Sequence, residues 1–214
     1  MWNKQHFLGK CRLFKRRKLM DIKKDRRIRK SKESLKHSLI NLMKEKPVNN
    51  ITVKELVSAA DLNRSTFYNY YCDIPDMLEK LETELYNEFM KILELHVKKE
   101  KIEKDIYNEA HKFIEDMCDV IKENMDFCKC IFSKNGDINF LFKLEELVEN
   151  HIKDQLREDF DGKIDHIAYV YSFAKSGYIG ILKSWMRGGC VESSEEIANL
   201  TYNLIKGALY SCKL

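Results

Sequence analysis

Polar and aromatic side chains crowd the segment from Arg64 to Tyr70, and their types suit the binding of nucleic acid. An Arg can pair with guanine, an Asn can pair with adenine, and hydroxyl groups can donate to phosphate oxygens. No acidic residue lies between Leu62 and Cys72 to repel a phosphate backbone. The candidate DNA contacts are Arg64, Ser65, Thr66, Tyr68, Asn69 and Tyr70. Residue spacing alone fits plain packing of two helices equally well.

Two short helices are predicted to position these side chains. Thr52 and Glu55 have the spacing of a capping box, so a first helix should begin after Thr52. A turn is expected at residues 60–62, because Asp61 and Asn63 prefer to hydrogen-bond local backbone. Asn63 then caps a second helix, whose inward face is predicted to carry Phe67 and Tyr71.

The string AADLNRSTFYNYYCDIPDML, from Ala59 onward, resembles the DNA-binding segment of TetR-type bacterial transcriptional regulators. That segment typically reads A-x-G-V-S-x-G-T-L-Y-x-H-F. Its Thr, Leu, Tyr and Phe positions are matched here by Thr66, Phe67, Tyr68 and Tyr71. The resemblance covers residues 29–81 and identifies the segment as a helix-turn-helix.

The resemblance implies a role for each candidate contact. The residues expected to approach bases or phosphates from the recognition helix are Arg64, Ser65 and Thr66. Tyr68 and Tyr70 are expected to contact the DNA backbone, and Thr52 is expected to anchor the preceding helix to a phosphate. The sequence departs from the family pattern at Asp61 and Ser65, which replace glycines, at Tyr70, which replaces the His, and at Ile74, where a phosphate-binding Lys is usual.

Composition predicts an all-α fold. The 214 residues are 44% apolar and contain only 8 Gly and 2 Pro, and no strand-like alternation is present. Apolar spacing predicts a helix at 29–44 that closes a three-helix head, and a long helix after Asp73 that joins this head to a helical-bundle body. Further helices are expected at about 104–123, 125–132, 138–160, 164–187 and 194–212. The predicted domains are a basic arm at 1–25, the DNA-binding domain at 26–73 and a regulatory and dimerisation domain at 74–214.

The amino-terminal end is strongly basic. Residues 1–30 contain thirteen Lys or Arg and two Asp, a net charge of +11. The whole chain carries +4, so the other residues carry +4 minus +11, or −7. A basic arm before a helix-turn-helix can add phosphate contacts or enter a minor groove. A solvated, disordered and inert tail is the simpler interpretation, and the sequence favours it.

Two apolar stripes near the carboxyl terminus favour pairing of two chains. The stretch FAKSGYIGILKSWMRGGCVESSEEIA, from Phe173 onward, resembles the carboxyl-terminal part of a TetR subgroup in which two helices build a dimer's four-helix bundle. The predicted dimer contacts are Tyr178, Ile181, Leu182, Trp185, Leu200 and Leu204. An intramolecular core would share the same periodicity.

An effector site is harder to predict. The residues that could line a pocket in the bundle are Phe113, Met117, Phe132, Phe140, Tyr169 and Phe173. Aromatic residues and Met at helical spacing more commonly form an ordinary core. The isolated His residues and the seven cysteines of irregular spacing predict no metal site, and no cofactor is expected.

Three hypotheses of function follow. The first is a homodimeric repressor that binds a palindromic operator in double-stranded DNA and is released by a small-molecule effector. The second is an activator that works through a protein co-regulator, because the subgroup that the carboxyl-terminal stretch resembles includes a dihydroxyacetone-kinase operon activator that senses metabolite through a partner. The third is a helical interaction protein with a vestigial DNA-binding segment, which the acid-free face disfavours.

Two classes of protein are not favoured by the sequence. It contains no phosphate-cradling Gly-rich loop, no H-E-x-x-H and no G-x-S-x-G, so an enzyme is not expected and no catalytic residue is assigned. It also contains no secretory leader pattern and no run of about 18 apolar residues, so we expect a cytoplasmic protein without a membrane segment.

Overall fold

The computed structural model describes residues 4–97, 106–133, 136–137, 139–147, 149 and 167–211, with side chains in the first helix from Asp25 onward. Every regular element in this part of the chain is a helix, which confirms the all-α prediction. The chain divides into two compact units, Met1–Met77 and Leu78–Leu214, which we call the head and the body. The boundary lies inside α4, which spans Ile74–Val97.

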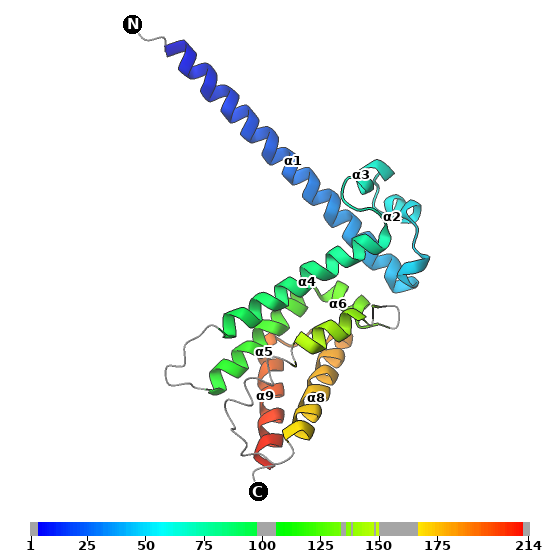
Figure 1. Cartoon of the computed structure of the whole chain (residues 1–214), viewed down its shortest axis with the longest axis vertical. Coiled ribbons are helices and arrows are strands. Elements are labelled where there is room, and N and C mark those ends of the chain that lie inside the picture. Colours follow the sequence, from blue (N-terminus) through cyan, green and yellow to red (C-terminus); the bar gives the residue numbers. More distant parts are fainter. Residues whose placement is uncertain are drawn as a thin grey trace. The chain divides into compact units, whose positions relative to one another are not determined.

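The head consists of α1 (Lys4–Glu45), a 3-10 turn η1 (Val48–Asn50), α2 (Val53–Ala59), α3 (Arg64–Tyr68) and the first turn of α4 (Figure 1). α1 packs against α2, and α2 packs against α3. The core of the head is formed by apolar side chains at the predicted spacing, all at most 5% exposed: Leu35, Leu39, Met43, Ile51, Leu56, Phe67 and Tyr71. Burial of each such side chain contributes about 1.5–3 kcal/mol, which offsets the cost of ordering such short helices.

The start of α1 differs from the prediction. The apolar spacing predicts a helix from about Arg29 after a disordered basic arm, whereas α1 begins at Lys4. The spacing of buried residues detects only the packed part of a helix. The residues before Arg29 are rich in Lys, Arg and Leu, which favour helix, and contain no Pro to end it. Helix therefore continues through residues 25–30, none of which is buried, and back to Lys4.

The body contains the rest of α4, α5 (Ile106–Glu123), α6 (Met125–Ile131), α8 (Ile167–Gly188) and α9 (Ser194–Ser211), and residues 139–147 are also helical (Figure 1). α5 packs chiefly against α9, α8 packs against α9, and α6 contacts α5 and α8. The predicted helices at 104–123, 125–132 and 194–212 are observed within one to two residues at each described end. Much of the predicted helix at 138–160 and the start of the one at 164–187 lie outside the described residues.

A left-handed turn joins α8 to α9. Gly189 and Cys190 have φ of 93° and 53°, and the Cys190 backbone N–H donates to the Trp185 carbonyl at 3.0 Å. Such positive φ values commonly end a helix. Ser193 and Glu196 then form a capping box for α9, in which the Ser193 N–H donates to Glu196 Oε2 at 2.7 Å. The predicted end of one helix near residue 187 and start of the next at 194 are therefore confirmed, and a sharp turn sets α9 beside α8.

Candidate nucleic-acid interface

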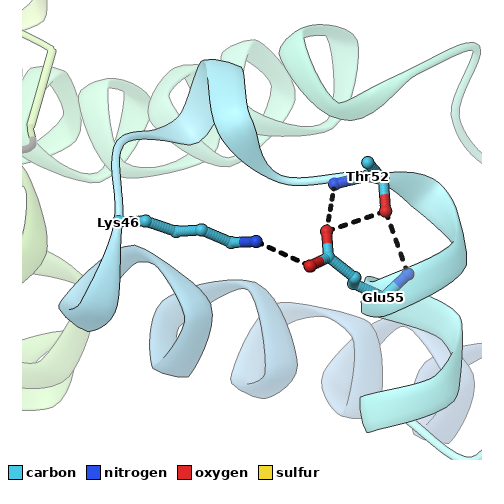
Figure 2. Close-up of polar contacts among 3 residues, drawn as sticks. All are labelled: Lys46, Thr52 and Glu55. Carbon is cyan, nitrogen blue, oxygen red and sulfur yellow. Dashed lines mark hydrogen bonds and ion pairs between the residues drawn. The ribbon is translucent and has the colours of Figure 1, made fainter.

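α2 begins with the predicted capping box, shown in Figure 2. Thr52 Oγ1 accepts the Glu55 backbone N–H at 3.2 Å, and Glu55 Oε2 accepts the Thr52 backbone N–H at 3.0 Å and its hydroxyl at 2.8 Å. Lys46 Nζ lies 2.7 Å from Glu55 Oε1. The hydrogen bond from Lys46, together with those from Thr52, lowers the pKa of Glu55 to about 2. The carboxylate thus stays ionised, and a phosphate that binds Thr52 has to compete with Glu55 for the Thr52 hydroxyl or N–H.

The turn after α2 closes through a residue in the left-handed region. Asp61, which stands where the family pattern has Gly, has φ of 52°. Its N–H donates to the Ser58 carbonyl at 3.3 Å, and the Leu62 N–H donates to the Val57 carbonyl at 2.9 Å, which is the paired bonding of a Schellman motif. Ser34 Oγ on α1 donates to the Ala60 carbonyl at 2.9 Å. The turn predicted at 60–62 is confirmed, and α1 satisfies a carbonyl at its start.

Asn63 caps α3 and also engages the neighbouring hydroxyls. Its Oδ1 accepts the Thr66 backbone N–H at 2.8 Å, the Ser65 hydroxyl at 2.6 Å and the Thr66 hydroxyl at 2.8 Å. The hydroxyl groups of Ser65 and Thr66 therefore both donate to Asn63. A phosphate contact from either hydroxyl requires it to exchange one hydrogen bond for another.

The two faces of α3 separate as predicted. Phe67 is fully buried and Tyr71 nearly so, with ring centroids 5.6 Å apart. The exposed positions on the opposite face are Arg64, Ser65, Tyr68 and Asn69, whereas Thr66 and Tyr70 are half-buried. The candidate contacts therefore lie on α3 or directly after it, except Thr52 at the start of α2, and their roles toward DNA remain predictions.

Tyr70 is also held from α1. The Lys32 ammonium lies 5.9 Å from the centroid of the Tyr70 ring, at the outer limit of a cation–π contact. Lys32 is exposed, so its charge lies at the surface beside the recognition helix. Sequence reasoning did not connect Lys32 with α3, because no local pattern links residues so far apart in the chain.

The predicted pocket residues divide into two groups. Met117 and Phe140 are buried, and Phe113 and Phe132 are half-buried. Tyr169 and Phe173, on α8, are 75% and 66% exposed. The two α8 residues therefore lie on the outside of the body and do not join the buried group, and an effector pocket among these six residues remains a prediction.

The predicted dimer residues also divide. Leu182 and Trp185 are 6% and 3% exposed within a single chain, and Trp185 Nε1 donates to the Glu192 carbonyl at 3.2 Å. Tyr178 and Ile181 are half-buried. Leu200 and Leu204, on α9, are 49% and 55% exposed. Leu182 and Trp185 thus belong to the intramolecular core and have little surface to offer a partner, whereas Leu200 and Leu204 retain theirs.

Sequence reasoning missed a buried carboxyl group in the body. Glu82 is 8% exposed, and its Oε1 has no hydrogen-bond partner within the described residues. Burial and the charge of Asp137 raise the pKa of Glu82 to about 7, with a smaller contribution from Glu79, although Lys143 opposes the shift. The signal was present in the sequence, because Glu82 lies four residues after Leu78 on the apolar stripe of α4.

Sequence reasoning also missed His96, which lies on the same apolar stripe of α4. It lies three residues after buried Leu93, and His96 Nε2 is 3.0 Å from Asp116 Oδ2 on α5. Lys112 Nζ is 2.9 Å from the other oxygen of Asp116. Burial pushes the pKa of Asp116 upward, but the hydrogen bonds from His96 and Lys112 outweigh it and lower the pKa. This network ties α4 to α5 inside the body.

Neither a metal centre nor a membrane segment is found within the described ranges. No group of three or more His, Cys, Asp or Glu side chains there is arranged to hold a metal ion. No helix in the same part of the chain is both long and apolar enough to cross a bilayer.

α2, the turn and α3 form a helix-turn-helix, and comparison with known proteins shows which class of protein the chain resembles. Residues 108–207 match the TetR family described as a transcriptional regulator C-terminal region. A TetR transcriptional regulator from Streptococcus agalactiae has a similar structure, with a TM-score of 0.53 and 22% identity, covering 86% of this chain and 98% of that one. A TetR-family regulator from Syntrophomonas wolfei gives a TM-score of 0.59 at 18% identity, with 85% and 96% covered.

A further similar structure is that of the dihydroxyacetone kinase operon activator DhaS, with a TM-score of 0.50 and 20% identity, covering 86% of this chain and 96% of that chain. A search of curated proteins found no significant match. The family match to the body and the shared fold confirm the resemblance seen in the helix-turn-helix. Residues 108–207 therefore match the TetR-type transcriptional regulators, and the chain has the fold of their solved structures.

Proposed function

We propose that this protein is a dimeric transcriptional repressor that reads a palindromic operator with α3 and is released by an effector bound in the body. The observation that carries the proposal is the exposed, acid-free face of α3, supported from beneath by fully buried Phe67. The face offers a guanidinium, an amide, hydroxyls and a phenol, all of which can donate hydrogen bonds to base edges and phosphates.

The hydrogen bonds around α3 suggest how these contacts are shared. Ser65 and Thr66 already donate to Asn63, so a new bond from either gains little. We therefore assign most of the contact energy to Arg64 and Asn69 at the bases and to Tyr68 at the backbone. Thr52 is the weakest candidate, because Glu55 engages its hydroxyl and its N–H.

A test of this assignment is to replace Arg64 or Tyr68 by Ala. Each substitution should weaken binding to an operator selected from random duplexes by about 1–3 kcal/mol, or five- to 150-fold, without changing stability. Glu79→Ala, an exposed change on α4, is the control. Unchanged affinity at fixed salt in the Arg64 and Tyr68 variants would remove α3 as the recognition helix.

The dimer is proposed to form through the outer faces of α8 and α9. The exposed apolar residues there recur at helical spacing, with Tyr169 and Phe173 on α8 and Leu200 and Leu204 on α9. Gly177 and Gly180 continue the α8 face, and a Cβ at either would meet no atom within 4 Å in a single chain. Small residues with open space beside an apolar stripe suit close approach of a second helix.

The dimer proposal predicts the effect of Leu204→Glu. This substitution should convert the dimer to a folded monomer, because it places a charge on an apolar interface without disturbing the intramolecular core. Sedimentation equilibrium provides the measurement, with Lys206→Glu as a control for added charge on α9. A monomeric wild-type protein, or a dimer that tolerates Leu204→Glu, would contradict the proposed interface.

Release is proposed to work through the spacing of two recognition helices. In a two-fold dimer these helices must lie about 34 to 36 Å apart to enter successive major grooves. α4 begins in the head and ends in the body, so one continuous helix belongs to both units. An effector that favours one arrangement of the body can act on that spacing, and DNA must weaken effector binding by the same factor.

A second candidate is an activator that senses metabolite through a protein co-regulator. The structural similarity to DhaS, which is described as an operon activator, is the observation that favours it. Operator complexes titrated with a panel of apolar metabolites, with and without cell extract, separate the two candidates. A direct response contradicts the partner mechanism, and a response only with extract contradicts a self-contained sensor. Deletion of the gene should raise target expression for a repressor and lower it for an activator.

A further inference from the structure

The buried residues of α1 that the structure describes lie in the carboxyl-terminal part of the helix. From Asp25 onward, Ser31 is the first buried residue, and Leu35 and Leu39 follow on the same face. Among the residues before Ser31 whose side chains are described, all are exposed except Ile28, which is half-buried. The helix nevertheless continues back to Lys4, as Figure 1 shows. We call the segment 4–30 the arm helix, and its described side chains, from Asp25 onward, lie outside the core of the head.

The arm helix concentrates positive charge. Residues 1–30 carry a net +11, and a helix from Lys4 to Lys30 is about 40 Å long at about 1.5 Å per residue. Cations recur three and four residues apart, as Arg26 does with Arg29 and Lys30. Like charges at this spacing each destabilise an isolated helix by about 0.2–0.5 kcal/mol. A polyanion beside the helix would remove this repulsion.

The arm helix begins next to the recognition helix. The Lys32 ammonium lies 5.9 Å from the Tyr70 ring centroid, and Ser34 Oγ bonds to the Ala60 carbonyl in the turn before α3. These two contacts are in the first packed turn of α1, directly after the arm helix. A DNA backbone that meets Tyr70 would therefore pass close to the point where the cations of α1 begin.

We propose that the arm helix is a second DNA contact, which binds the phosphates of the duplex that flanks the sequence read by α3. The proposal rests on the proposed function, because α3 must bring the duplex to α1. The arm helix reads no bases. It contributes affinity by releasing counterions, with a loss of about 0.9 in the slope of log affinity against log salt for each contact removed. The net charge and helical form of the segment distinguish this role from that of an inert tail.

The experiment compares two charge-neutralising variants of the full chain. Arg26→Gln with Arg27→Gln removes two exposed cations of the arm helix, and Lys91→Gln with Arg187→Gln removes two exposed cations of the body as a matched control. The probes are a selected operator with and without about 15 flanking base pairs on each side. Affinity is measured from 50 to 200 mM salt.

The arm variant should lower the salt slope on the flanked probe by up to about 1.8, so that its affinity falls about twelvefold less than wild type across this salt range. It should also lose the advantage that flanking duplex gives to wild type, while the control variant keeps both. Operator preference over random duplex should not change. Arg29→Gln with Lys30→Gln provides a second test at exposed sites, with circular dichroism confirming that each variant is folded.

The outcomes are distinguishable. If both arm variants keep the wild-type salt slope and still bind the operator selectively, the arm contact is overturned and the proposed function of α3 is retained. Absence of selective binding by the wild-type chain removes the proposed function instead. Unchanged slopes on DNA together with arm-dependent binding to phosphatidylserine vesicles would overturn the DNA proposal and assign the arm helix to an anionic membrane surface.

Discussion

Replacing Glu82 by Gln should stabilise the body above neutral pH. Glu82 is almost fully buried, its Oε1 has no hydrogen-bond partner within the described residues, and its pKa is raised from 4.5 to about 7 by burial and the charge of Asp137. The folded chain therefore holds a proton more tightly than the unfolded chain. Stability from this proton is fully present below pH 4.5 and is lost as the pH rises through 7.

The magnitude follows from the difference between the two pKa values. At about 1.4 kcal/mol per pKa unit, ionising Glu82 in the folded protein costs about 3 kcal/mol once the pH exceeds 7. Gln keeps the shape of the side chain and removes the charge. The Glu82→Gln variant should thus gain up to about 3 kcal/mol over wild type at pH 8, and the difference between them should shrink steadily toward pH 5.

The assay is urea unfolding of both proteins at pH 5, 6, 7 and 8. The free energy of unfolding is compared at each pH, so that titration common to both proteins cancels. Glu84→Gln is the matched control, since Glu84 lies on the same helix, is exposed and does not contribute to the pKa shift of Glu82. A difference between Glu82→Gln and wild type that stays constant from pH 5 to 8 would refute the reasoning, because the cost of burying the ionised group would then be absent.

Two further predictions concern the backbone. Asp61→Gly should stabilise the head by about 0.5–1 kcal/mol in urea unfolding, because Asp61 has φ of 52° and Gly adopts that conformation without steric cost; an Asp61→Ala variant as stable as Asp61→Gly would contradict this. Gly136→Ala should destabilise the body by about 1–3 kcal/mol, since a Cβ there would lie 1.9 Å from the Ile131 carbonyl oxygen. Gly188→Ala, where a Cβ meets no atom within 4 Å, should change stability by less than about 0.5 kcal/mol, and equal effects at the two glycines would be evidence against the tight contact.

The sequence by itself determined the local features of the head. Thr52 and Glu55 form the predicted capping box, Asn63 caps α3, and Phe67 and Tyr71 are buried. Each of these features depends on residues at most four positions apart. Spacing within one or two helical turns decides which side chains meet, so these contacts can be predicted from the sequence alone.

The body shows what periodicity cannot decide. Leu182 and Trp185 are among the residues predicted to pair two chains, yet they are buried within one chain. Tyr169 and Phe173 were expected inside a pocket, yet they are exposed. An apolar stripe indicates that a helix face is buried against another surface. Whether that surface belongs to the same chain or to a second chain depends on how several helices pack, and sequence spacing does not determine this packing.

Only the tertiary structure brought together residues distant in sequence. The Ser34 hydroxyl meets the Ala60 carbonyl, Lys32 lies by Tyr70, and His96 pairs with Asp116. It also placed Glu82 in the core beside Asp137, where a carboxyl group titrates near neutrality. Sequence patterns predict helices because helical hydrogen bonds are local. The pKa of a side chain and the partner of a hydroxyl are set by neighbours that folding supplies from elsewhere in the chain.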